Sequence, residues 1–179
     1  MRILVLGAGG TGGYFGARIH NAGGDVTFLV RPARKTQLRE NGLKVSSPFG
    51  DLQIIPKVIT KDELNSHFDV VMLSCKAYDL DSAIESIAPA VGEQSVIFPL
   101  LNGIKHLDIL AARFGAEQVL GGVAMISIVL APDGEIKHLN QMHRLICGSR
   151  TSPLSKWLQP IAQLLSSSGI DFSLSDNIE

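Results

Sequence analysis

The sequence has few of the residues that cross-link small secreted proteins or bind metals. Its 179 residues include two cysteines, Cys75 and Cys147, with no C-x-x-C pair and no Cys/His ligand spacing. Neither a disulfide framework nor a zinc site is indicated, so we expect two ordinary, partly buried thiols and no bound metal. His106, His138 and His143 show no paired spacing either, and we expect them to be surface or hydrogen-bonded residues.

An excess of charge of one sign is also missing. The formal net charge is -1 at pH 7, and the sequence pI is about 6.5. Such a chain has no overall field to attract nucleic acid or an anionic membrane, although a local patch would suffice for a small acidic metabolite. No apolar run reaches membrane-spanning length, and the first residues lack the features of a signal peptide. We therefore expect a cytoplasmic protein that binds neither nucleic acid nor membranes.

Glycine, by contrast, is concentrated at the start of the chain. A predicted strand, 2–6, runs directly into Gly7-Ala8-Gly9-Gly10-Thr11-Gly12, and an amphipathic segment follows. Gly7, Gly9 and Gly12 have the G-x-G-x-x-G spacing of dinucleotide-binding turns. Gly7 would permit the tight turn, Gly9 would let a pyrophosphate approach, and Gly12 would let the new helix pack closely on the strand. The free N–H groups of that helix would face the phosphates. The alternative is a glycine turn that only satisfies packing.

The end of the second predicted strand, 26–30, indicates which cofactor is bound. NAD-preferring sites usually place Asp or Glu there, where it accepts hydrogen bonds from the adenine ribose. This chain has Arg31 there, with Arg34 and Lys35 close behind, while Asp25 lies at the opposite end of the strand. A guanidinium can pair through two hydrogen bonds with a 2′-phosphate, which a carboxylate would repel. The sequence therefore predicts NADPH over NADH, and the alternative is a solvated basic start of a helix.

Strands and helices then alternate along the chain. This alternation implies parallel strands joined by right-handed crossovers, so we predict an α/β fold with a Rossmann-type, doubly wound and mainly parallel sheet. Lys76 and Asn102 follow two of the predicted strands, at the edge where such sheets bind ligands. Alternatively, Lys76 faces solvent and Asn102 only forms a turn with Gly103. The predicted helices are 33–41, 79–90 and 105–114, and the predicted strands between them are 68–73 and 95–98.

Two further segments have antiparallel patterns and form the predicted antiparallel extension. Segments 43–45 and 52–55 flank a turn-rich stretch, which indicates a small hairpin inserted into the wound sheet. A three-stranded meander is predicted further on. A chain of this length, with 45% hydrophobic residues, suits one domain over residues 1–179. The meander strands are 123–130, 135–139 and 144–147, followed by a helix at 154–167 and a strand at 170–172.

Five motifs follow one another along the chain: the opening strand with its glycine turn, Leu29-Val30-Arg31, Ser74-Cys75-Lys76-Ala77, Leu101-Asn102-Gly103 and Gly121-Gly122. In this order they resemble the ketopantoate reductase family, the NADPH-dependent 2-dehydropantoate 2-reductases of pantothenate biosynthesis. The resemblance implies that the turn from Gly7 to Gly12 holds the NADPH pyrophosphate and that Arg31 holds the 2′-phosphate. It also implies that Lys76 lies near the nicotinamide ribose and that the Asn102 amide contacts cofactor and substrate.

The resemblance also implies that part of the enzyme is absent from this chain. Family members carry a catalytic lysine in a second, all-helical domain, and this sequence ends at Glu179, before that lysine. The general acid for ketone reduction would then lie beyond Glu179, so we expect this portion alone to bind cofactor and to turn over poorly. The full-length parent would reduce 2-dehydropantoate or a similar 2-oxo acid. A related dehydrogenase for another ketone and a non-catalytic NADP-binding sensor are alternatives, and the oligomeric state, a homodimer included, is left open.

Overall fold

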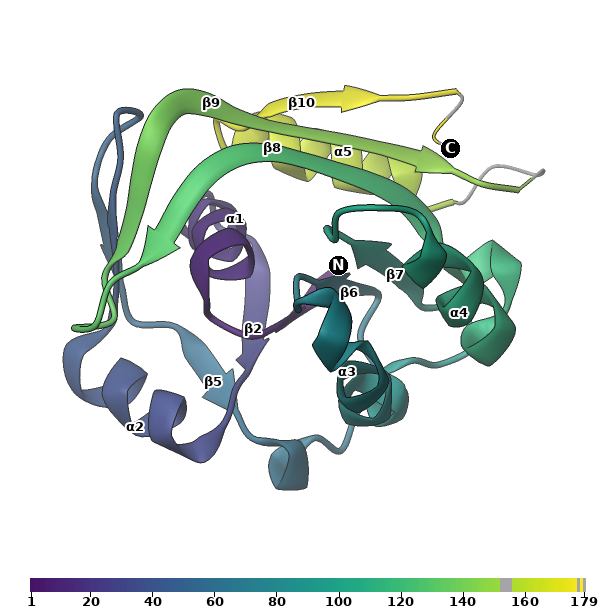
Figure 1. Ribbon diagram of the computed structural model, residues 1–179, viewed down its shortest axis with the longest axis horizontal. Coiled ribbons are helices and arrows are strands. Elements are labelled where there is room, and N and C mark those ends of the chain that lie inside the picture. Colours follow the sequence, from purple (N-terminus) through teal and green to yellow (C-terminus); the bar gives the residue numbers. More distant parts are fainter. Residues whose placement is uncertain (152–155, 177, 179) are drawn as a thin grey trace.

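A parallel sheet organises the computed structural model, which describes residues 1–151, 156–176 and 178. Each neighbouring pair of its strands is parallel, and the strand order reverses between β1 and β6. The chain winds from β1 to β2 in one direction and from β6 to β7 in the other, which confirms the doubly wound, Rossmann-type prediction (Figure 1). The five strands are, in spatial order, β5 (Lys57–Ile59), β2 (Asp25–Leu29), β1 (Arg2–Leu6), β6 (Val70–Leu73) and β7 (Val96–Pro99).

Helices cover both faces of this sheet. On one face, Phe15 of α1 shares a hydrophobic core with Val5 and Phe28. On the other face, α3 and α4 pack against the alternate residues of the same strands, with Leu4 and Val71 in the second core. The helices are α1 (Gly10–Asn21), α2 (Pro32–Asn41), α3 (Leu80–Ile87), α4 (Lys105–Phe114) and α5 (Leu158–Ser167), with short 3-10 turns at Lys61–Glu63, Ala77–Asp79, Ala88–Ala90 and Ala116–Gln118.

A second sheet lies over α1. Its longest part is an antiparallel pair, β8 (Leu120–Leu130) and β9 (Ile136–Ser149), which we call the β8–β9 arm. β9 also pairs in parallel with β3 (Leu43–Ser46) and β10 (Asp171–Leu174), and β4 (Leu52–Ile54) pairs antiparallel with β3. Figure 1 shows the arm curving over α1, with α5 packed beside β10. The predicted antiparallel extension is thus present and larger than expected.

The structure corrects two predictions for this sheet. The hairpin at 43–45 and 52–55 forms, but it belongs to the second sheet and is not inserted into the wound one, because Val45 pairs with Ile136 of β9. The predicted meander is one long hairpin, since β9 continues through 139–142, whose polar residues suggested a turn. An irregularity between Ile126 and Ile128 absorbs the change in register.

Other element boundaries differ modestly from the sequence predictions. The edge strand β5 was not predicted, because three residues directly after Pro56 give too short a pattern to recognise. The predicted helix 154–167 is present as α5 from Leu158, and residues 154 and 155 lie outside the described part of the chain. The last strand is Asp171–Leu174 rather than 170–172.

Helix α1 is enclosed because the parallel sheet lies on one side of it and the arm on the other. Its residues from Gly12 to Ile19 are all buried. Large side chains pack directly against two glycines of this helix. A Cβ on Gly16 would lie 2.7 Å from the ring of Phe28, and one on Gly13 would lie 2.4 Å from Cδ1 of Ile136. Such close approach leaves no room for even a methyl group, which fixes how the helix sits between the two sheets.

A buried polar cluster joins α1 to the second sheet. The Tyr14 hydroxyl lies 2.9 Å from Nδ1 of His143 and 3.4 Å from Oγ of Ser47, which in turn lies 3.0 Å from Nδ1 of His138. The ring of Phe49 stacks on His143 with centroids 3.6 Å apart. Both histidines are therefore hydrogen-bonded, as expected, but they are buried rather than on the surface. His106 is buried as well, and its Nε2 has no hydrogen-bond partner among the described residues, which corrects the expectation for this histidine.

This burial predicts that the fold loses stability on mild acidification. Burial lowers the pKa of His143 below its ordinary value of 6.5, with smaller contributions from Arg18 and His138 in the same direction and an opposing one from Asp171. Burial, with Arg150, lowers the pKa of His106 too. Below pH 6.5 the unfolded chain therefore binds protons at these histidines that the folded chain does not bind. The contribution of the neutral histidines to the unfolding free energy is complete above pH 6.5 and is lost as the pH falls below it.

Urea unfolding at about pH 7.5 and about pH 5.5 checks this prediction, because most carboxylates titrate below that range. We expect a lower unfolding free energy at the lower pH, and a smaller pH dependence in His143→Asn, whose amide oxygen can replace the Nδ1 acceptor. An unfolding free energy that is equal at the two pH values would show that the histidines do not carry this linkage.

Candidate functional site

The loops after four parallel strands meet at one edge of the sheet. Leu6 at the end of β1 is level with Leu29 of β2 and Leu73 of β6, and Leu73 is level with Pro99 of β7. Ligands of open α/β sheets bind at this edge beside the reversal of strand order, which here lies between β1 and β6. The predicted site residues follow these strand ends: Gly7, Ala8, Gly9, Gly10, Thr11, Gly12, Arg31, Lys76 and Asn102.

The glycine turn leaves backbone donors and open space. Gly7 has φ +85°, a conformation that favours glycine, and its N–H donates to the carbonyl of Leu29 at 2.8 Å. A Cβ built on Gly7 or Gly9 would meet no atom within 4 Å. Within the described residues, the N–H groups of 9–12 have no acceptor, and the first α1 hydrogen bond runs from Gly13 to the Gly9 carbonyl at 2.9 Å. Unpaired amides at the positive end of a helix fit an anion such as a pyrophosphate.

Neighbouring elements of the fold pack closely against two other glycines of the turn. A Cβ on Gly12 would lie 2.3 Å from Oγ of Ser74 and 3.1 Å from Cγ1 of Val5, so the helix approaches the sheet closely there, as the motif predicts. A Cβ on Gly10 would lie 3.0 Å from Cγ2 of Ile128 in the arm. The Cα of Gly10 therefore faces the arm, and its contribution to a ligand would come from the backbone N–H.

The three basic residues after β2 have different surroundings. Lys35 forms an ion pair with Glu63, and this hydrogen-bonded contact, together with hydrogen bonds from the backbone and side chain of Thr60, lowers the pKa of that carboxyl to about 2. Arg34 is partly buried and donates to backbone carbonyls, and burial lowers its pKa. Arg31 is exposed, and its side chain has no hydrogen-bond or ion-pair partner in the described part of the chain. Among the residues that the structure describes, Arg31 is thus the one cation of this basic cluster whose side chain has no partner. Asp25 at the far end of β2 pairs with Lys57.

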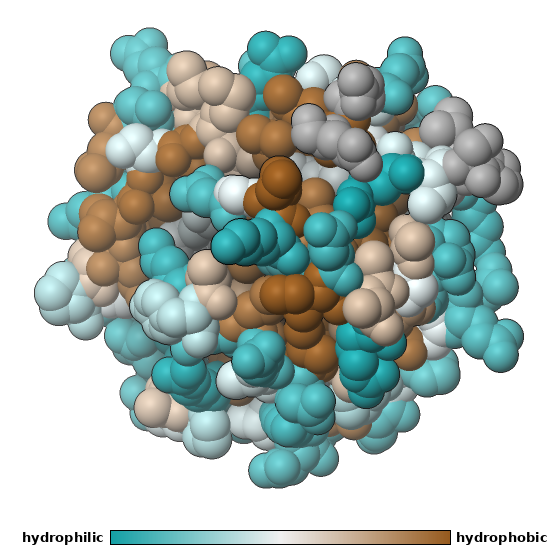
Figure 2. Space-filling view, turned by 45° about the vertical axis from the view of Figure 1, so that its right-hand side comes forward, coloured by the Kyte–Doolittle hydropathy of each residue, from teal (hydrophilic) through white to brown (hydrophobic). Residues whose placement is uncertain are grey.

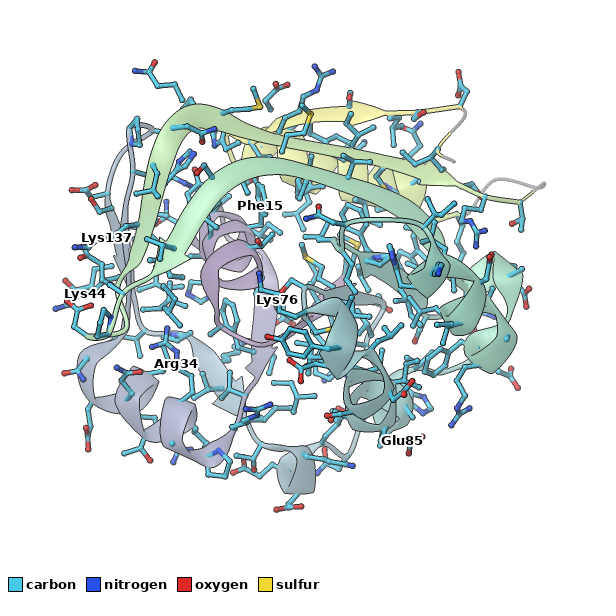
Figure 3. All side chains as sticks on the ribbon, in the orientation of Figure 1. Phe15, Arg34, Lys44, Lys76, Glu85 and Lys137 are labelled. Carbon is cyan, nitrogen blue, oxygen red and sulfur yellow. The ribbon has the colours of Figure 1, made fainter. Side chains whose placement is uncertain are left out.

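Lys76 and Asn102 are exposed at the ends of β6 and β7. Figure 3 shows Lys76 between α1 and α3, in the middle of the view. Gly103, not Asn102, has the positive φ of the turn, +84°, so the backbone conformation does not require an asparagine there. Apolar side chains lie next to both residues in the sequence: Tyr78 is 84% exposed and Ile104 is 68% exposed. Figure 2 shows other apolar patches reaching the surface.

The two cysteines carry no evident chemistry. Burial, with a smaller effect from Asp79, raises the pKa of the Cys75 thiol, which keeps it protonated at neutral pH, and burial raises the pKa of Cys147 to about 12.

Among the described residues, no group of three or more His, Cys, Asp or Glu side chains gathers as a metal site. None of the helices described is both long enough and apolar enough to cross a membrane.

The approach of the arm to the glycine turn was not predicted from the sequence. The motif itself needs Gly7, Gly9 and Gly12, so Gly10 and Gly13 are additional glycines in the turn and the first helical turn. The structure shows that Ile128 and Ile136 of the arm lie over these two positions. Surplus glycines at the start of the helix were thus the one signal for a second element packed on it.

Comparison with known proteins identifies the family. A family model described as "Ketopantoate reductase PanE/ApbA" matches residues 3–151. The chain belongs to this family of oxidoreductases. The "Uncharacterized oxidoreductase YkpB" of Bacillus subtilis (strain 168) is 40% identical over 179 residues, which are 100% of this chain and 59% of that protein.

Two solved structures extend the likeness to three dimensions. The 2-dehydropantoate 2-reductase from Geobacter metallireducens GS-15 superposes with a TM-score of 0.90 at 32% identity, over 98% of this chain and 58% of that one. A D-mandelate dehydrogenase bound to NADH and anilino(oxo)acetate superposes with a TM-score of 0.89 at 25% identity, over 99% and 58%. The chain therefore spans less than two thirds of the length of each of these three relatives. The D-mandelate dehydrogenase among them binds NADH.

The packing of the turn predicts that the same substitution destabilises the fold at one glycine and leaves it nearly unchanged at another. Gly12→Ala forces Ser74 to move and crowds Val5, so we expect it to lower the unfolding free energy by about 1–3 kcal/mol. Gly9→Ala, the matched control, has extended backbone angles and open space, so its stability should change by less than about 0.5 kcal/mol. Urea denaturation of both variants checks this, and equal losses would mean that Gly12 is not a packing contact.

Proposed function

We propose that this chain is the NADPH-binding portion of a cytoplasmic oxidoreductase that reduces 2-dehydropantoate, or a similar 2-oxo acid, to the 2-hydroxy acid in pantothenate biosynthesis. The observation that supports it most is the turn at Gly7–Gly12, with unpaired amides and open space at the start of α1. This turn lies at the switch point of a ketopantoate reductase-family fold. The dinucleotide would supply a hydride, and the chain would bind and orient it.

In this proposal the N–H groups of Gly9 to Gly12 hold the pyrophosphate, and Arg31 selects the phosphorylated cofactor. Arg31 supports the choice of NADPH because it is exposed at the end of β2 and has no partner within the described residues. No carboxylate follows this strand to accept hydrogen bonds from the ribose hydroxyls. Arg34 and Lys35 already have partners. A single free guanidinium is enough for a bidentate contact with a 2′-phosphate.

Lys76 and Asn102 are proposed to lie at the nicotinamide end of the cofactor. Both follow strands β6 and β7, on the far side of the switch point from Arg31, and a dinucleotide bound across the strand ends would extend toward them. Asn102 can donate and accept hydrogen bonds and would also contact the 2-oxo acid, while the Lys76 ammonium can attract its carboxylate. The group that protonates the reduced carbonyl is proposed to lie beyond Glu179 in the whole protein.

A second candidate function is reduction of a different 2-oxo acid. It is favoured by the similarity to a D-mandelate dehydrogenase, which resembles this chain in fold as closely as a 2-dehydropantoate 2-reductase does. Activity assays of the full-length protein with 2-dehydropantoate and with an aromatic 2-oxo acid separate the two candidates. Turnover of the aromatic acid alone would contradict the choice of 2-dehydropantoate.

The cofactor assignment predicts that Arg31 determines the preference for NADPH. Replacing it with Gln removes the charge that would meet the 2′-phosphate, so we expect the Kd for NADPH to rise about 10–100-fold, equivalent to about 1.5–3 kcal/mol for a charged hydrogen bond. The Kd for NADH should remain unchanged. Titrations monitored by nicotinamide fluorescence measure both values, with Arg39→Gln, on the exposed part of the same basic helix, as the matched control.

An unchanged ratio of the two dissociation constants in Arg31→Gln would contradict this assignment.

The pyrophosphate assignment has its own test in Gly9→Ala, whose added methyl group would occupy the open space over the turn. We expect this variant to fold normally and to bind neither dinucleotide tightly.

A further inference from the structure

Arg34 connects three separate parts of the molecule. Its guanidinium donates through Nε at 3.2 Å and NH2 at 2.9 Å to the carbonyl oxygen of Ala8, in the glycine turn. NH2 also donates to the carbonyl of Gly134, at the tip of the β8–β9 arm, at 3.1 Å, and NH1 donates to Oε1 of Gln37 at 2.6 Å. Figure 3 shows Arg34 between α2 and the lower end of the arm.

The acceptors of Arg34 are backbone carbonyls and one amide oxygen, so this cation orients the main chain rather than neutralising a carboxylate. Gln37 extends the same arrangement, because its Nε2 donates to the carbonyl of Asp133 at 3.0 Å. The tip of the arm is thus held to α2 by two side chains that both contact its backbone. Gly134, with φ +88°, lies so close that a Cβ there would be 2.5 Å from NH1 of Arg34.

The contact with Ala8 also sets the direction of an amide in the glycine turn. In a trans peptide the C=O and the next N–H point in opposite directions. With the Ala8 carbonyl directed at Arg34, the N–H of Gly9 is directed away from it. Gly9 is the N-cap of α1, and a Cβ on it would meet no atom within 4 Å. Arg34 therefore holds in one orientation the N–H of Gly9, which has no acceptor among the described residues.

The arm that Arg34 fastens also touches the turn directly. Ile128 of β8 lies against Gly10, and Ile136 of β9 lies against Gly13. Fixing the arm tip at Gly134 therefore limits how far these two side chains can move from the start of α1. The turn is held at its carbonyl by Arg34 and at its helical side by the arm.

We infer that Arg34 is a positioning residue that preorganises the glycine turn for the pyrophosphate and does not contact the 2′-phosphate. This inference rests on the proposed dinucleotide binding and assigns different roles to neighbouring cations. Arg31 acts on the 2′-phosphate alone, whereas Arg34 acts on the pyrophosphate, which NADPH and NADH share. Losing Arg34 should therefore weaken the binding of both cofactors by the same factor.

The test measures the dissociation constants of NADPH and NADH for Arg34→Lys, which keeps the charge but loses the planar fork of donors. We expect both constants to rise about tenfold, the size of one charged hydrogen bond that is lost. Arg39→Lys makes the same change on the exposed side of α2 and should leave both constants unchanged. In Gly134→Ala, the added Cβ stands at φ +88° and would lie 2.5 Å from both NH1 of Arg34 and Nε2 of Gln37, so the arm tip must move away from these two side chains. This variant leaves Arg34 itself unaltered and should reproduce the equal rise.

Three results would overturn this inference. A rise for NADPH alone in Arg34→Lys would mean that Arg34 contacts the 2′-phosphate. Unchanged constants for both cofactors, with a loss only in the unfolding free energy, would mean that its role is purely structural. Binding of neither dinucleotide by the unsubstituted chain would overturn the proposed function itself, and the inference with it, whereas the first two results leave dinucleotide binding intact.

Discussion

Enclosure of helix α1 between two sheets is the constraint on which the rest of the structure depends. The parallel sheet contacts the helix through Val5 and Phe28, and the β8–β9 arm contacts it through Ile128 and Ile136. Both approaches need glycine on the helix, at Gly12 and Gly16 on one side and at Gly10 and Gly13 on the other. A helix held so closely has its N-terminal amides in a fixed position, which is what an anion site at a helix start requires.

This enclosure separates the glycines into two groups with different physical reasons. Gly7 and Gly9 border open space, so their lack of a side chain serves the backbone conformation and access to the turn. Gly10, Gly12 and Gly13 border other elements, so their lack of a side chain serves packing. A ligand at the turn would therefore meet a surface whose shape depends on packing beneath and beside it.

Much of the fold could be predicted from the sequence because its signals are local. The glycine turn between an apolar strand and an amphipathic helix, together with the alternation of strands and helices, predicted the parallel sheet and its carboxyl edge. The assignment of 43–45 and 52–55 to the wound sheet failed, because pairing of Val45 with Ile136 joins residues far apart in the sequence and leaves no local trace. The continuous β9 was missed because its polar stretch, which includes Asn140 and Gln141, resembles a turn.

The positions of the candidate site residues were predictable from the sequence, but the separate surroundings of the three basic residues were not. Sequence position alone brought Lys76 and Asn102 to the same edge as the glycine turn, since both follow parallel strands. It did not distinguish Arg31, Arg34 and Lys35, because their separate surroundings depend on Glu63 and on the arm tip, which are distant in the sequence.

The most direct measurement of the central claim is the backbone amide NMR spectrum of the chain with and without NADPH. If the start of α1 holds the pyrophosphate, the amide signals of Gly9, Gly10, Thr11 and Gly12 should show the largest shifts, because those N–H groups gain an acceptor. Saturable binding that leaves these four signals in place would contradict the account.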